Sequence, residues 1–100
     1  MDLCQERGIG VFLDIPTRPA PTWLHKKFPS IDIVDRNGIR QNAHFRYMED
    51  VGDPHFREYA YRLAAVMAKR YASHPALQAF GMCNELGSGF ISYSPTARDR

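Results

Sequence analysis

The amino-acid sequence predicts an α/β protein with a parallel sheet. Two nearly uninterrupted apolar runs, residues 9–15 and 76–83, have the composition of strands that are buried on both faces. One long amphipathic pattern between them predicts a helix. Strand, helix and strand in this order indicate a right-handed βαβ unit. These residues leave open whether the sheet closes into a barrel or stays open.

The chain starts with a short helical segment. Residues 1–7 are typical of the last turns of a helix, and Gly8 stands where helices often end in a left-handed conformation. A helix that began at Met1 would have no N-cap, so we expect the segment to begin within an element. The first apolar run follows directly, and Pro16 and Pro19 end it.

A long connection, residues 16–52, shows no helical periodicity. Residues 31–34 and 39–41 flank Asp35-Arg36-Asn37-Gly38, which predicts a short β-hairpin because Asn-Gly is a strong turn signal. A connection of this length is usually functional or carries its own structure. Its aromatic residues argue against a disordered linker; they are Trp23, Phe28, Phe45 and Tyr47.

The clearest predicted helix begins at Asp53-Pro54, where Asp53 can serve as N-cap and Pro54 suits the first helical position. Apolar residues then recur at three- and four-residue spacing, which predicts a stripe that packs in the core; they are Phe56, Tyr59, Ala60, Leu63, Val66, Met67 and Tyr71. Ser73-His74-Pro75 ends the helix, and we expect His74 to be structural. Ser94-Pro95 predicts the start of another helix.

Composition excludes several classes of function. The chain has 100 residues, 44% hydrophobic and 24% charged, with a net charge of +2 that is too small to indicate nucleic-acid binding. No apolar stretch reaches membrane-spanning length, and no signal peptide is recognisable. The two cysteines and four histidines lack metal-ligand spacing, so we predict reduced thiols and no metal. This pattern favours a cytoplasmic location.

Polar residues follow both predicted strands. Asp14 stands at the end of the first, and Asn84-Glu85 follow the second. A carboxyl held at a partly buried strand end is costly without partners, and it can stay protonated near neutral pH and donate that proton. Taken alone, Asn84-Glu85 is a weak motif, and such a dipeptide is more often a surface-loop carboxylate. Asp14 can either reach such a site or cap the loop that follows it.

The order of the motifs adds a resemblance. Five stretches of the sequence resemble glycoside hydrolase family 42, in the same order and over essentially all 100 residues. They are GIGVFLDIPTRPAPTWL, IDIVDRNGIRQ, DPHFREYAYRLAAVMAKRY, SHPALQAFGMCNELG and ISYSP. The resemblance implies a fragment of a (β/α)₈ TIM barrel, residues 1–100 being an incomplete catalytic domain with the third and fourth strands. It implies a retaining hydrolase of terminal β-D-galactosides, with Glu85 as acid/base and Asn84 on the sugar's 2-hydroxyl.

Two features depart from that family's pattern. The nucleophilic glutamate is expected on the seventh strand, which these residues do not contain, so we expect the 100 residues alone to be inactive. Many members carry a cysteine cluster for zinc, whereas Tyr47-Met48-Glu49-Asp50 stands where a Tyr-Cys-Pro-Asn-like stretch is common. We therefore predict no metal and no cofactor. The expected partner is a β-galactoside or related oligosaccharide, and neither nucleic acid nor a membrane is expected. The full-length protein can form a homo-oligomer.

Several alternatives stay open at this point. Trp23 is our candidate for stacking on a sugar ring, although packing the loop onto the barrel is the competing role. His44 and Arg46 can line the sugar site. Cys83 lies within the apolar run, and we expect it to be a small buried apolar residue and not a nucleophile. The function can be that of another retaining barrel glycosidase, acting on arabinosides, mannosides or glucosides. It can also be a non-catalytic carbohydrate-binding module or a truncated product.

Overall fold

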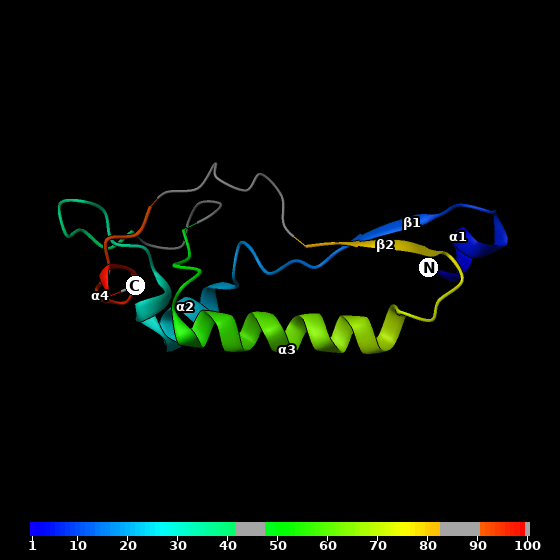
Figure 1. The fold of residues 1–100 in the computed structure, drawn as a ribbon. Coiled ribbons are helices and arrows are strands. Elements are labelled where there is room, and N and C mark those ends of the chain that lie inside the picture. Colours follow the sequence, from blue (N-terminus) through cyan, green and yellow to red (C-terminus); the bar gives the residue numbers. More distant parts are fainter. Residues whose placement is uncertain (42–47, 83–90, 100) are drawn as a thin grey trace.

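The structure is a computed structural model that describes residues 1–41, 48–82 and 91–99. Its elements follow one another as the sequence predicts, with strand, connection, long helix and strand in order (Figure 1). They are α1 (Asp2–Glu6), β1 (Val11–Asp14), α2 (Thr22–Lys27), the 3₁₀ turn η1 (Pro29–Ile31), α3 (Pro54–Tyr71), β2 (Leu77–Gly81) and α4 (Pro95–Arg98).

β1 and β2 form a parallel pair, which confirms the βαβ unit. Val11 pairs with Leu77, and after an irregularity in register Asp14 pairs with Gly81. Both strands are shorter than the apolar runs that predicted them. The prediction of burial on both faces is wrong within this chain, because β1 alternates between half-buried and exposed residues and Phe12 is 69% exposed. A barrel covers both faces of such strands with further elements.

The first helix, α1, ends before Gly8, as predicted. α1 is closed by hydrogen bonds from the amides of Gly8 and Ile9 to the carbonyls of Gln5 and Cys4, at 3.0 and 2.8 Å. Gly8 has a φ of 65°, in the left-handed region that glycine adopts without steric cost. His74 connects α1 to the residues before β2, because its Nε2 lies 2.8 Å from Asp2 Oδ1 and its Nδ1 accepts a hydrogen bond from the amide of Ala76. That contact fits the structural role predicted for His74.

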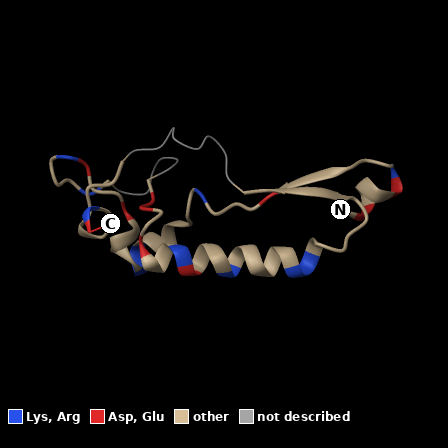
Figure 2. Cartoon of the chain, in the orientation of Figure 1, with Lys and Arg blue, Asp and Glu red and all other residues tan. Residues whose placement is uncertain are grey.

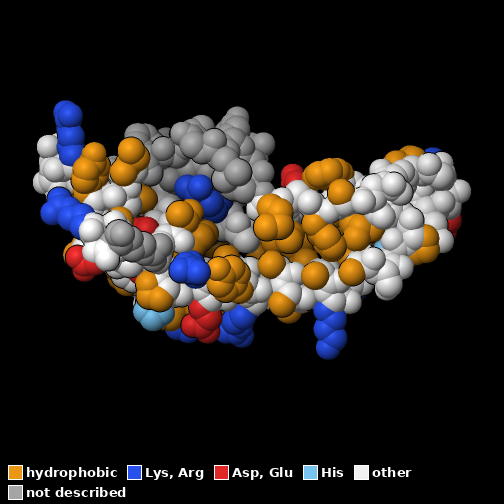
Figure 3. Space-filling model, viewed as in Figure 1, with side chains coloured by type: hydrophobic (Ala, Val, Ile, Leu, Met, Phe, Trp, Pro, Cys, Tyr) orange, Lys and Arg blue, Asp and Glu red, His pale blue; other side chains and the backbone are white. Residues whose placement is uncertain are grey.

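α3 begins at Pro54 because Asp53 caps it. The Asp53 side chain accepts hydrogen bonds from the amides of His55 and Phe56, as the sequence predicts. The predicted apolar stripe is buried only at its start: Phe56 is 5% exposed, whereas Val66 is 65% exposed. α3 runs alongside the two strands in Figure 1, and Figure 3 shows hydrophobic side chains gathered over both. In a barrel this face is covered by neighbouring strands and helices.

The buried apolar core lies where the connection packs against the first turns of α3, beyond the carboxyl ends of the strands. It consists of Ala20, Leu24, Ile31 and Phe56, with Phe28, Tyr59 and Ala60 packed against it. The connection therefore carries its own structure, which confirms the expectation from its length. The helix α2 within it was not predicted, because Pro21 at its N-cap offers no side-chain acceptor and six residues are too few to show periodicity.

The predicted hairpin is present at the far end of the connection. Val34 pairs with Arg40, Gly38 has a φ of 81°, and the Asp35 carboxylate accepts from the amides of Asn37 and Ile39. On its other side, the first arm of the hairpin is bridged to the residues that precede α3, through Asp32 and Glu49. The hairpin is therefore fixed to the rest of the connection and does not project as an isolated loop.

The whole chain is elongated, with extents of 53 × 24 × 22 Å. The strands with α1 form one end, the connection with α4 forms the other, and α3 extends between them (Figure 1). Charged residues are concentrated on α1, α3 and the connection, and among the strand residues only Asp14 is charged (Figure 2). Among the described residues, no helix is long and apolar enough to cross a bilayer.

Candidate active site

The parallel pairing places the carboxyl ends of both strands at one edge. The amide of Ile15 donates to the carbonyl of Gly81 at 2.9 Å, so the two strands end side by side. Asp14 lies across this edge, because a Cβ added to Gly81 would overlap a carboxylate oxygen of Asp14. Glycine at position 81 therefore leaves room for an exposed carboxylate at the strand ends. This is the edge at which α/β barrels build their active sites.

The two principal predicted site residues, Asn84 and Glu85, lie outside the described residues. In the sequence they follow Gly81, the last residue of β2, by three and four positions. His44, Arg46 and Cys83 also lie outside the described residues. Their predicted roles stay predictions.

Trp23, the third predicted site residue, lies on α2 and is 53% exposed. Its ring meets that of Tyr59 edge to face, with centroids 5.6 Å apart. Beside it is a mostly apolar cavity of about 240 Å³, whose lining includes Pro16, Leu24 and Leu63. Trp23 thus packs on one edge against α3 and leaves about half of its surface open, an arrangement compatible with both of the roles weighed for it.

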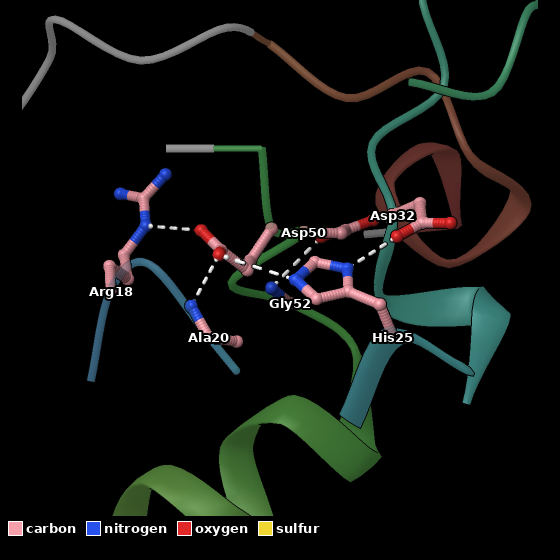
Figure 4. A network of polar contacts seen from close by, with 7 residues as sticks. Arg18, Ala20, His25, Asp32, Asp50 and Gly52 are labelled. Carbon is pink, nitrogen blue, oxygen red and sulfur yellow. Dashed lines mark hydrogen bonds and ion pairs between the residues drawn. The ribbon is translucent and has the colours of Figure 1, made fainter. Parts of the chain in front are cut away.

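A buried polar network in the connection was not predicted. Glu49, only 3% exposed, accepts from the backbone amide of Ala20 at 2.6 Å and from Arg18 Nε at 3.3 Å (Figure 4). His25 Nδ1 lies 2.5 Å from Asp32 Oδ1, while its Nε2 is 3.5 Å from Glu49 Oε1, which is too long for a strong hydrogen bond. Each carboxylate is therefore paired with a nitrogen donor in a water-poor place.

A second buried carboxylate, Asp50, faces a different set of partners. Its Oδ2 accepts from the Ser94 hydroxyl at 2.5 Å, and its Oδ1 accepts from the amide of Gly52 at 2.9 Å. Ser94 in turn caps α4 by accepting from the amide of Ala97. Asp50 therefore joins the end of the connection to the chain that follows β2. No sequence signal reveals this pair, because its members are 44 residues apart.

The zinc cluster of some family-42 enzymes does not fit the residues described here. Within residues 1–41, 48–82 and 91–99, no group of three or more histidine, cysteine or acidic side chains could hold a metal ion. Asp50 and Ser94 bond to each other, and Glu49 bonds to Ala20 and Arg18. We therefore derive no chemistry through a metal.

Comparisons with known proteins agree in sequence and in structure. Beta-galactosidase BgaA of Planococcus sp. (strain 'SOS Orange') is 34% identical over 82 residues, which are 82% of this chain and 12% of that protein. The beta-galactosidase of Thermus thermophilus is 36% identical over 80 residues, covering 80% of this chain and 12% of that protein. The crystal structure of a cold-adapted beta-galactosidase from Rahnella sp. R3 is 30% identical with a TM-score of 0.88, over 95% of this chain and 14% of that one.

The βαβ unit and the match to this solved structure define the class of the protein, an α/β protein whose fold is part of a (β/α)₈ barrel. The family model of glycoside hydrolase family 42, described as beta-galactosidase, matches residues 1–100. The chain belongs to this family, which confirms the resemblance seen in the sequence. It spans about an eighth of the length of the relatives compared here, 12% in both curated cases.

Proposed function

We propose that this chain is part of the catalytic barrel of a retaining glycosidase that acts on terminal β-D-galactosides. The observation that carries the proposal is the match of all 100 residues to a family described as beta-galactosidase. The parallel strands support it, because β2 ends at Gly81, three residues before the Asn-Glu pair in the sequence. The substrate class follows from relatives that are themselves named beta-galactosidases.

In this proposal Glu85 is the general acid/base. A retaining glycosidase uses two carboxyl groups about 5–5.5 Å apart, one as nucleophile and one as acid/base. Glu85 protonates the leaving glycosidic oxygen and later takes a proton from the water that hydrolyses the glycosyl-enzyme intermediate. Asn84 donates a hydrogen bond to the sugar's 2-hydroxyl, a contact that strengthens in the transition state. The nucleophile belongs to another strand of the complete enzyme.

Trp23 is proposed to stack on the substrate. Its half-exposed ring and the apolar cavity beside it support this role, because a flat apolar face matches the C–H groups of a sugar ring. Its edge contact with Tyr59 fixes the ring without covering both faces. Trp23 therefore has a defined orientation and free surface for a ligand.

The decisive test is Glu85→Gln in the complete enzyme. The two side chains are nearly the same size, so the fold should persist. Turnover of a galactoside with a poor leaving group should fall by about 10²–10⁴-fold, the usual contribution of general acid catalysis. Formation of the glycosyl-enzyme from a dinitrophenyl galactoside should suffer less. Azide should restore turnover and yield a β-configured glycosyl azide, because an anionic nucleophile needs no base.

Glu58→Gln is a matched control, since Glu58 is an exposed carboxylate on α3 whose ion pair with Arg62 lies at the surface. It should leave kcat and KM unchanged. If Glu85→Gln kept full activity on the poor substrate, the acid/base assignment would be wrong. Comparison of aryl β-D-galactosides with the corresponding glucosides, mannosides and arabinosides tests the sugar specificity separately.

The proposal also includes a cytoplasmic location and a homo-oligomeric complete enzyme. Two cysteines without the spacing of a disulfide framework support the reducing compartment. Cell fractionation tests the location, and light scattering of the purified enzyme tests the assembly.

A further inference from the structure

We propose that Asp14 is a substrate-binding residue whose carboxylate accepts hydrogen bonds from hydroxyl groups of the galactosyl ring. This inference rests on the proposed function and adds to it a residue that determines sugar specificity. Asp14 is the last residue of β1 and the only charged residue in the two strands (Figure 2). Its place in the barrel, its unused oxygens and the glycine that accommodates it each support this role.

Asp14 lies on the face of the sheet that α3 does not cover. Side chains alternate along a strand, so Phe12 and Asp14 share one face of β1, and both are exposed. Val11 and Leu13 point to the other face and are partly buried. Because α3 runs alongside the strands (Figure 1), it covers the face of Val11 and Leu13. The helices of a (β/α)₈ barrel form its outer ring, so the face of Phe12 and Asp14 is the interior of the barrel.

Asp14 also stands at the end of the barrel interior where substrates bind. It pairs with Gly81, the last residue of β2, and the next amide, that of Ile15, still bonds to the carbonyl of Gly81 at 2.9 Å. Asp14 is therefore at the last level of the paired strands. Active-site residues of such barrels come from the carboxyl ends of several strands. An inward side chain at this level faces the space that the substrate occupies.

The Asp14 carboxylate does not cap the loop that follows it, which was the other role that the sequence allowed. The amide of Ile15 bonds to Gly81, and Pro16 has no N–H group. The amide of Thr17 donates to the carbonyl of Ile15 at 2.9 Å. Within the described residues, no hydrogen bond or ion pair reaches the Asp14 carboxylate. Both of its oxygens therefore keep their acceptor sites for a ligand.

Gly81 accommodates this carboxylate. A Cβ at position 81 would overlap Oδ1 of Asp14 and would lie 2.9 Å from its Cγ and 3.0 Å from Cε1 of Phe12. Unlike Gly8 and Gly38, Gly81 does not have a positive φ, so its backbone conformation is open to other residues. The close approach of the Asp14 side chain is therefore the reason that glycine is needed here. Any larger residue would displace the carboxylate from its place at the strand ends.

The chemistry of a carboxylate fits the donors that a sugar ring offers. An ionised carboxylate only accepts hydrogen bonds, and its two oxygens can accept from two neighbouring hydroxyl groups. Bonds to a charged acceptor are stronger than bonds between neutral groups. A sugar that lacks the matching hydroxyl would leave the carboxylate desolvated and without a partner, so it would be rejected. The 2-hydroxyl is assigned to Asn84 in the proposed function, which leaves the 3-, 4- and 6-hydroxyls for Asp14.

Deoxygenated substrates test this contact in the complete enzyme. The measured quantity is kcat/KM for an aryl β-D-galactoside and for its 3-, 4- and 6-deoxy forms. Asp14→Ala should lower kcat/KM for the galactoside by about 10- to 150-fold, the usual contribution of a hydrogen bond to a charged group. For at least one deoxy form the two enzymes should agree within about twofold, because the bond is then missing from both. Asp14→Asn keeps one acceptor oxygen and should lose less than Asp14→Ala.

Gly81→Ala tests the space that the carboxylate needs. It should reproduce most of the loss seen in Asp14→Ala. In an Asp14→Ala background it should cost much less than in the parent, because no carboxylate is left to displace. Glu58→Gln on the exposed surface of α3 is the control and should keep kcat/KM for all four substrates. The Tm of Asp14→Ala should stay close to that of the parent, as expected for an exposed side chain.

Failure of this inference is distinct from failure of the proposed function. Unchanged kinetics in Asp14→Ala would show that the carboxylate does not bind the sugar. An equal loss on the galactoside and on all three deoxy forms, with a lowered Tm, would show a structural role instead. Fully additive losses in Asp14→Ala and Gly81→Ala would contradict the role given to the glycine. If Glu85→Gln has no effect, the proposed acid/base fails, while the comparison of deoxy substrates still decides the role of Asp14.

Discussion

Asp53→Ala should destabilise the start of α3 by an amount at the upper end of the range for loss of a helix cap. Asp53 is 1% exposed, and its Oδ1 accepts from the amides of His55 and Phe56 at 2.8 and 3.2 Å. Alanine offers no acceptor, so both amides lose their partner. The amide of Phe56 is buried, which keeps water from replacing the carboxylate.

The expected magnitude follows from these contacts. Loss of an N-cap acceptor costs about 0.5–2 kcal/mol, and an anion at a helix N-terminus contributes about 0.3–1 kcal/mol through the helix dipole. Because two amide donors lose their acceptor and one of them is buried, we expect the upper end, about 2 kcal/mol. At about 1.4 kcal/mol per factor of ten, local opening of the first turn should become about 30-fold more frequent.

Hydrogen exchange of the complete enzyme measures this opening directly. Peptides that span residues 51–62 should exchange about 30-fold faster in Asp53→Ala, and Asp53→Asn should retain most of the protection. Glu58→Ala is the matched control, because its ion pair with Arg62 is exposed and worth less than about 1 kcal/mol. Equal exchange in Asp53→Ala and the parent would refute the argument that this cap holds the helix start.

Three further predictions concern other parts of the chain. The 100 residues alone should not turn over an aryl β-galactoside, because the second carboxyl is expected elsewhere, and Glu85-dependent turnover would contradict this. They should not melt cooperatively either, because Phe12 and Val66 are 69% and 65% exposed. A sharp transition of the monomer in calorimetry would contradict this second expectation. Trp23→Ala should raise KM about two- to tenfold, the worth of one aromatic contact, with Trp23→Phe retaining most of the affinity; an unchanged KM would rule out stacking. The hydrogen bond and charge of His74 lower the pKa of Asp2 below its ordinary range, so the stabilisation is present above about pH 3.9 and is lost as pH falls through the lowered pKa. The Tm difference between the parent and Asp2→Asn should close over that acid range, and a pH-independent difference would count against it.

Local rules predicted the elements that local chemistry determines. Asp53-Pro54 gave the start of α3 and Ser94-Pro95 that of α4, because a cap needs only a few neighbouring residues. The Asn37-Gly38 turn and Gly8 were predictable for the same reason. The apolar runs predicted both strands, although each strand proved shorter than its run.

Features that depend on distant partners were not predictable from pattern alone. Glu49 and Asp50 look like two ordinary surface acids in the sequence, and only the fold brings Ala20 and Ser94 to them across 29 and 44 residues. The strand faces were predicted to be buried, but their burial depends on neighbours that a βαβ unit does not itself supply. Of the candidate site, the acid/base hypothesis and Trp23 came from sequence patterns, whereas the buried polar network became visible only in the structure.

The side chains of Glu49 and Asp50 point to opposite sides of an extended segment, so their contacts depend on the register of that segment. Inserting one residue directly before Glu49 would turn each carboxylate to the opposite side, so that Asp would face the side of Arg18 and Glu the side of Ser94, with side chains of the wrong length. A two-residue change would restore the sides but displace the contacts by roughly 6.5 Å along the strand. Changes in length should instead be absorbed at the exposed hairpin turn around Asn37 and Gly38, which makes that turn the natural place for an inserted tag or reporter.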